Sequence, residues 1–229
     1  MSKLFDRDTH MRYLSLLLTV MSKTFPEHLA FKGGTCAALF YNLPRFSFDL
    51  DFDIVRPFGN AETSLLREIV SQHGNVREFY DKSFTLFCLF DYGKGHPNIK
   101  IELNKRLWKN NTYKPAWFMG VAMRIADEST LITNKIIALT NRRGAVARDL
   151  YDTWFFLKKG YSLNDALIME RTSQDKNTYL KSVIMFIKKH FTSRNVLQGL
   201  GESLDEKQKV WVKAHLINET MSEIERLIK

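Results

Sequence analysis

The chain has 229 residues, of which 45% are hydrophobic, so it can bury a core and is not a wholly disordered protein. Its 34 Lys and Arg residues outnumber its 25 Asp and Glu residues, and the net charge of +9 favours a polyanionic partner. Cys36 and Cys88 lack the spacing of a metal site, which fits reduced thiols in the cytoplasm. No signal-peptide pattern is present, and the apolar run 14–20 is too short to span a bilayer, so no membrane association is expected.

Hydrophobic periodicity separates the chain into two regions. In chain order, the pattern predicts a helix over 7–24, a short helix over 35–42, a strand over 46–55, a helix over 61–73, and strands over 84–90, 98–106 and 119–126. The pattern is helical from residue 129 onward. We therefore expect an α+β (α/β) chain, with a small mixed sheet in an α/β lobe over 1–128 and a mostly helical lobe over 129–229.

The turn Gly33-Gly34-Thr35 stands directly before the short predicted helix. Two glycines let a backbone approach a ligand closely, and the free N–H groups at a helix start can bind phosphate. An ordinary turn is the alternative interpretation. The phosphate-binding interpretation gains weight because a short helix and then a strand with paired carboxylates come after the turn.

Asp49 and Asp51 lie two residues apart on that strand, so their side chains project from one face. Two carboxylates this close repel each other unless a cation lies between them. Mg²⁺ prefers oxygen ligands and is often bound by one or two carboxylates plus substrate phosphates. A solvated strand face is the alternative. Asp53 shares the face and is interpreted as a structural or supporting residue. Together with the turn, this pattern indicates chemistry on a nucleoside triphosphate.

The order of turn, helix and Asp-x-Asp strand resembles the first motif of the nucleotidyltransferase superfamily with the DNA polymerase β-like fold. The form here, Lys32-Gly-Gly-Thr followed by Arg45-Phe-Ser-Phe-Asp-Leu-Asp-Phe, resembles the AbiEii/MenT toxin family. The superfamily adds a third carboxylate on a later strand, and Glu102 between two apolar residues offers one. The alternative for Glu102 is an exposed charge on a half-buried strand. Thr35 stands where many members have Ser, and Glu102 where many have Asp.

The family resemblance continues with a pair of helices that carry Lys135 and the segment from Arg148 to Asp152. It implies that Lys135 contacts the nucleotide phosphates and that Asp152 is the helix aspartate of the family's catalytic pattern. Helical spacing puts Arg148 and Asp152 on one face, where an ordinary intrahelical ion pair is the alternative. Asp149 is explained equally well as an acidic residue in the first turn of a helix.

The resemblance implies a nucleotidyltransferase fold and an NTP-dependent toxin of a bacterial toxin–antitoxin or phage-defence pair. The implied catalytic residues are Asp49, Asp51, Glu102, Lys135 and Asp152, and the first three are also the implied ligands of Mg²⁺ or Mn²⁺. The implied nucleotide-binding residues are Gly33, Gly34, Thr35, Lys135 and Arg148. The expected acceptor is RNA, the 3′ end of tRNA, and a cognate antitoxin is the implied protein partner. Transfer to a protein or small molecule, and a non-catalytic RNA- or partner-binding module, stay open as alternatives.

Overall fold

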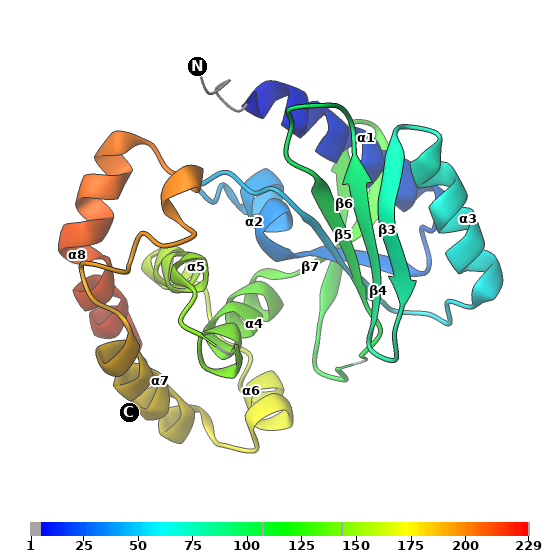
Figure 1. The fold of residues 1–229 in the computed structure, drawn as a ribbon. Helices are drawn as coiled ribbons and strands as arrows, with labels where there is room; N and C mark the ends of the chain where they lie inside the picture. The colour runs from blue at the N-terminus through cyan, green and yellow to red at the C-terminus, as the bar shows by residue number, and fades with distance from the viewer. Residues whose placement is uncertain (1–5, 107, 143, 229) are drawn as a thin grey trace. The chain divides into compact units, whose positions relative to one another are not determined.

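The computed structural model describes residues 6–106, 108–142 and 144–228 (Figure 1). These residues form two compact units. The first takes residues 6–40, 47–106 and 113–126, and the second takes 41–46, 108–112 and 127–228. The second unit thus includes two short segments that a division at residue 128 assigns to the first lobe.

A seven-stranded sheet forms the first unit, in the order β3-β4-β5-β2-β1-β7-β6 (Figure 1). The pairs β1–β7 and β2–β5 are parallel and the remaining pairs are antiparallel. This mixed sheet confirms the predicted fold class. The strands are β1 Leu29–Lys32, β2 Leu50–Ile54, β3 Asn75–Asp81, β4 Thr85–Asp91, β5 Ile99–Asn104, β6 Tyr113–Phe118 and β7 Val121–Ala126.

Helices α1 (Arg7–Thr24), α2 (Gly33–Tyr41) and α3 (Asn60–Ser71) complete the first half of the chain. The Asp6 side chain caps α1 by accepting the N–H groups of Asp8 and Thr9. The apolar residues of α1 at helical spacing are buried, as are alternate residues of β2, β4 and β5. One face of each of these strands is therefore in the core, and the opposite face carries Asp51 of β2, Glu102 of β5 and, on β4, the apolar residues Phe87 and Leu89.

The strands predicted over 84–90, 98–106 and 119–126 correspond to β4, β5 and β7, and β4 and β5 pair as an antiparallel hairpin. The strand predicted over 46–55 begins only at Leu50 in the structure. The carbonyls of Phe48 and Asp49 accept hydrogen bonds from the side chains of His10 and Thr35. Residues 46–49 are therefore irregular backbone held by side chains.

The second unit is mostly helical, as predicted. Its helices are α4 Glu128–Asn141, α5 Ala147–Lys158, α6 Asp165–Thr172, α7 Lys176–His190, the short 3₁₀ helix η1 Gly201–Ser203, and α8 Glu206–Glu225. Asp or Asn side chains cap α4, α6, α7 and α8 by accepting a backbone N–H of the first turn. None of the helices in the described ranges is both long and apolar enough to cross a membrane.

Candidate active site

Asp51 and Glu102 are direct partners on the adjacent parallel strands β2 and β5. Opposed residues on neighbouring strands project from the same face, and the strands lie about 4.8 Å apart. Leu50 and Phe52, which flank Asp51, are fully buried on the other face. The sheet therefore brings together two of the three predicted metal carboxylates, which are far apart in the sequence.

Gly33 makes room for the Asp51 carboxylate. A Cβ added to Gly33 would overlap the Asp51 side chain, and the φ of Gly33 is +79°. Both the close approach and the backbone conformation favour glycine at this position. The helix α2 begins at Gly33, so the N–H groups of Gly33, Gly34 and Thr35 have no acceptor within the helix. The predicted glycine turn and the predicted carboxylate thus form one local structure.

Asp49 precedes β2, and side chains hold its backbone in place. Thr35 Oγ1 donates to the Asp49 carbonyl at 2.5 Å, and Thr35 is fully buried. His10 Nε2 lies 3.0 Å from the Phe48 carbonyl, which can only accept, so Nε2 carries the proton. Burial lowers the pKa of His10, which favours the neutral form of the imidazole. The Thr35 hydroxyl is used within the protein, and its part in nucleotide binding stays a prediction.

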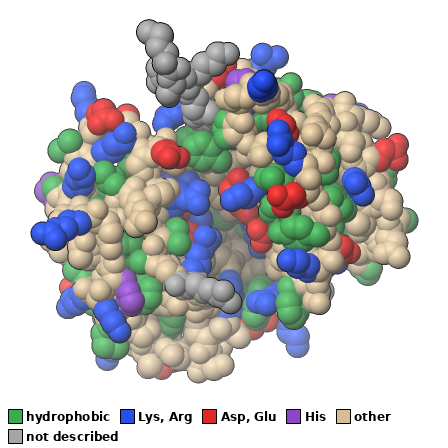
Figure 2. All heavy atoms as spheres, in the orientation of Figure 1, with side chains coloured by type: hydrophobic (Ala, Val, Ile, Leu, Met, Phe, Trp, Pro, Cys, Tyr) green, Lys and Arg blue, Asp and Glu red, His purple; other side chains and the backbone are tan. Residues whose placement is uncertain are grey.

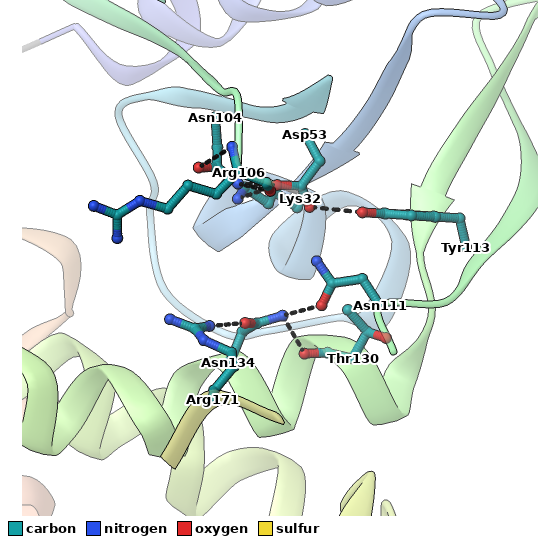
Figure 3. Close-up of polar contacts among 9 residues, drawn as sticks. All are labelled: Lys32, Asp53, Asn104, Arg106, Asn111, Tyr113, Thr130, Asn134 and Arg171. Atoms are coloured by element: carbon teal, nitrogen blue, oxygen red, sulfur yellow. Dashed lines mark hydrogen bonds and ion pairs between the residues drawn. The ribbon is translucent and has the colours of Figure 1, made fainter. Parts of the chain in front are cut away.

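Asp53 shares the face of Asp51 but has a different environment (Figure 3). Its Oδ1 lies 2.6 Å from Lys32 Nζ and accepts from Asn104 at 2.7 Å, and its Oδ2 accepts from Tyr113 at 2.9 Å. The Asp53 side chain is buried. These contacts tie four strands together and support the interpretation of Asp53 as a structural residue.

In the second unit, Asp152 binds two cations in a buried network. Arg45 Nε and Nη2 donate to its two oxygens at 2.5 and 2.6 Å, and Lys135 Nζ lies 2.8 Å from Oδ2. The side chains of Arg45 and Asp152 are 3% and 0% exposed, so this pair is cut off from water. The structure therefore brings the predicted Lys135 and Asp152 together.

The charges of this network support one another. Burial favours the neutral form of Asp152, but Arg45 and Lys135 outweigh it and lower the pKa of that carboxyl to about 2. Burial also disfavours charged Lys135, but Asp152 and Asp149 outweigh it and raise the pKa of the lysine. Both groups are therefore charged at neutral pH.

The remaining predicted residues of α5 differ in their contacts. Asp149 lies 3.3 Å from Lys135 Nζ and 3.0 Å from Arg142 Nε, so it belongs to the network. Asp152 pairs with Arg45 and Lys135, and no ion pair joins it to Arg148 among the residues that the structure describes. The alternative of an intrahelical Arg148–Asp152 pair is therefore wrong, because Asp152 faces partners from other segments. The nucleotide-binding role of Arg148 stays a prediction.

The sequence pattern does not reveal the part that Arg45 plays. It presents Arg45 only as a member of the motif before Asp49, and a single arginine after a proline carries no periodic signal.

Asn134, which precedes Lys135 on α4, is held in place by hydrogen bonds (Figure 3). Its amide donates to the Asn111 side chain at 3.2 Å and to the Thr130 carbonyl at 2.9 Å, and it accepts from Arg171.

A divalent cation is the cofactor that the sequence resemblance implies. Within the described ranges, no group of three or more His, Cys, Asp or Glu side chains forms a metal site. Mg²⁺ needs only one or two carboxylates when substrate phosphates and water supply the other ligands. Asp51 and Glu102 are two carboxylate residues at opposed positions on β2 and β5, and the missing side chain of Gly33 leaves room for the Asp51 carboxylate. These residues fit a metal that binds together with its phosphate substrate.

Comparisons with known proteins show what the chain is similar to. The family model described as "Nucleotidyl transferase AbiEii toxin, Type IV TA system" matches residues 16–221. A crystal structure from H. pylori, described as a candidate nucleotidyltransferase, has a TM-score of 0.58 at 18% identity and covers 96% of this chain and 98% of that one. JHP933 from Helicobacter pylori has a TM-score of 0.52 at 21% identity, covering 96% and 94%. At these identities the likeness concerns the fold. No curated protein matches the chain.

Proposed function

Because the chain belongs to the AbiEii nucleotidyltransferase toxin family of type IV toxin–antitoxin systems, we propose that it transfers a nucleoside monophosphate from an NTP to RNA, at the 3′ end of tRNA. Membership of the family also implies a cognate antitoxin, and we place the reaction in the cytoplasm. One observation carries the proposal: Asp51 and Glu102 lie opposite each other on β2 and β5, and the missing side chain of Gly33 leaves room for the Asp51 carboxylate.

The metal-binding residues in this proposal are Asp51, Glu102 and Asp49. A bound Mg²⁺ or Mn²⁺ would neutralise phosphate charge and stabilise the attacking and leaving oxygens. The free N–H groups at the start of α2 suit the β- and γ-phosphates. Lys135, as the family resemblance implies, adds positive charge for the departing pyrophosphate.

The proposed reaction is an in-line displacement at the α-phosphorus. The 3′-hydroxyl oxygen of the RNA bonds to the α-phosphorus, and the bond from that phosphorus to the α–β bridging oxygen breaks. Pyrophosphate leaves with the electron pair, and Glu102 accepts the hydroxyl proton. Positioning and electrostatic stabilisation supply the rate enhancement. Asp152 acts in this scheme as a positioning residue, because both of its oxygens hold cations of the protein.

The surface charge supports RNA as the acceptor. Lys and Arg side chains are spread over the visible face of the molecule (Figure 2), and the net charge is +9. An excess of cations attracts the phosphate backbone of nucleic acid without regard to sequence.

The test is incubation of purified protein with total tRNA, Mg²⁺ and each α-³²P-labelled NTP in turn, with Asp49→Ala as the control. Labelling of tRNA by the wild type but not by Asp49→Ala supports the proposal, and the NTP that supplies the label identifies the base. Label on the protein alone would favour protein modification. Absence of label, with unchanged cellular toxicity of an Asp49→Ala/Asp51→Ala double variant, would favour a non-catalytic binding module.

Replacing Gly33 by alanine is expected to lower the transfer rate by about 10²-fold, because the new Cβ displaces the Asp51 carboxylate. Gly120→Ala is the matched control, since Gly120 also has a φ of +79° but has nothing within 4 Å of an added Cβ. Both variants carry the same backbone strain, so Gly120→Ala reports the effect of that strain, and any further fall in the melting temperature of Gly33→Ala reports the overlap with Asp51. Equal transfer rates in the two variants would contradict the role assigned to Gly33.

A further inference from the structure

A row of side chains crosses the sheet on the face that carries the candidate carboxylates Asp51 and Glu102. Asp51 lies opposite Glu102, Glu102 opposite Phe87 on β4, and Phe87 opposite Tyr80 on the edge strand β3. Directly opposed residues project from one face. Two strand spacings place the Cα of Tyr80 about 10 Å from that of Glu102. An aromatic pair therefore continues the row of acidic residues to the edge of the sheet.

The two rings are stacked, so Phe87 occupies only one face of the Tyr80 ring. Tyr80 and Phe87 are stacked, with centroids 4.6 Å apart and an angle of 11° between their planes. Tyr80 is 36% exposed, and Phe87 is half-buried beneath it. The ammonium of Lys82 lies 4.4 Å from the centroid of the Tyr80 ring. Because Phe87 occupies one face of that ring, Lys82 covers the other, and a lysine side chain is flexible enough to move aside for a ligand.

Cations border the aromatic pair. Lys100 lies two residues before Glu102 on β5 and is exposed. The guanidinium of Arg106 lies 4.2 Å from the ring centroid of Phe84, in the loop that joins β3 to β4. Asp81 is paired with Lys105, so this acid adds little net negative charge. Exposed rings flanked by cations suit a ligand that has both flat rings and phosphates.

We propose that Tyr80 and Phe87 form a stacking platform for an unpaired base of the acceptor RNA, next to the 3′ end that Glu102 receives. This proposal rests on the proposed function. A base that stacks on Tyr80 displaces the ammonium of Lys82, which then pairs with a phosphate of the same strand. Stacking accepts any base, because every base has a π face. Proteins commonly bind unpaired RNA bases on aromatic side chains in this way.

The binding test uses a fluorescein-labelled RNA hairpin with a four-nucleotide 3′ overhang and the same hairpin with a blunt end, without NTP. The wild-type protein is expected to prefer the overhang. Tyr80→Ala should weaken binding of the overhang hairpin roughly 5- to 150-fold, the range for loss of one stacked base. Tyr80→Phe keeps the ring, so its Kd for the overhang hairpin should lie within about twofold of the wild-type value. Trp117→Ala is the matched control, because Trp117 is 73% exposed on β6 at the other edge of the sheet.

Three results would overturn the platform. They are equal binding of the two hairpins by the wild type, an unchanged Kd for Tyr80→Ala, and an equal loss of binding in Trp117→Ala. Transfer assays separate this proposal from the proposed function. Tyr80→Ala should raise the KM for the overhang hairpin and leave the KM for NTP unchanged. If Tyr80→Ala labels RNA normally and its KM for RNA is unchanged, the platform is wrong and the proposed function is unaffected. If the wild type labels no RNA, the proposed acceptor is wrong.

Discussion

Replacing Asp51 by asparagine is expected to lower kcat for nucleotidyl transfer by about 10²- to 10³-fold or more, with little change in stability. The amide keeps the shape of the side chain next to Gly33 but removes the negative charge that a metal–triphosphate complex needs. The measurement is steady-state transfer from α-³²P-labelled NTP to tRNA, alongside the melting temperature.

Asp53→Asn is the matched control for this variant, because Asp53 lies two residues along the same strand face. Its oxygens bind Lys32, Asn104 and Tyr113, so the change should cost stability and largely spare kcat. Loss of the charge that Lys32 contacts should cost about 1–3 kcal/mol of the free energy of unfolding. If Asp53→Asn abolished transfer while Asp51→Asn retained it, the two roles assigned here would be reversed.

Replacing Arg45 by alanine is expected to lower the free energy of unfolding by about 3–5 kcal/mol. The change removes a bidentate partner and leaves the fully buried Asp152 with only Lys135. Urea unfolding monitored by circular dichroism measures the loss. Arg142→Ala is the control, because Arg142 pairs with Asp149 from a half-exposed position and should cost far less. Equal losses in the two variants would contradict the importance assigned to burial.

The same network predicts a dependence of stability on pH. The pKa of Asp152 falls from an ordinary 3.8 to about 2 in the folded protein, so the folded state prefers the charged carboxylate. The stabilisation is present in full above pH 4 or so, and it is lost as the pH falls through about 2. Other carboxyls also titrate in this range, so the wild-type curve must be compared with that of Asp152→Asn. Parallel curves for the two proteins would contradict the prediction.

Much of the fold could be predicted because local patterns specify it. The helical spacing of the apolar residues of α1, the apolar run of β4 and the apolar–polar alternation of β5 identify these elements directly. Strands β1, β3 and β6 could not be predicted in this way. β1 has four residues, too few to show a period, and β3 is largely exposed. β6 contains Pro115, a residue that argues against a strand unless the strand lies at the edge of a sheet, as β6 does.

The sequence by itself determined the local parts of the candidate site, because these depend only on neighbouring residues. The glycine turn, the helix start and the shared face of Asp51 and Asp53 all follow from spacing. Spacing puts those two aspartates on the same face, and the tertiary structure shows how their surroundings differ. Strand pairing places Asp51 between Gly33 and Glu102, and it surrounds Asp53 with hydrogen-bond donors. The partners of Asp152 and the row from Glu102 to Tyr80 were likewise decided by tertiary structure, because segments distant in the sequence supply them.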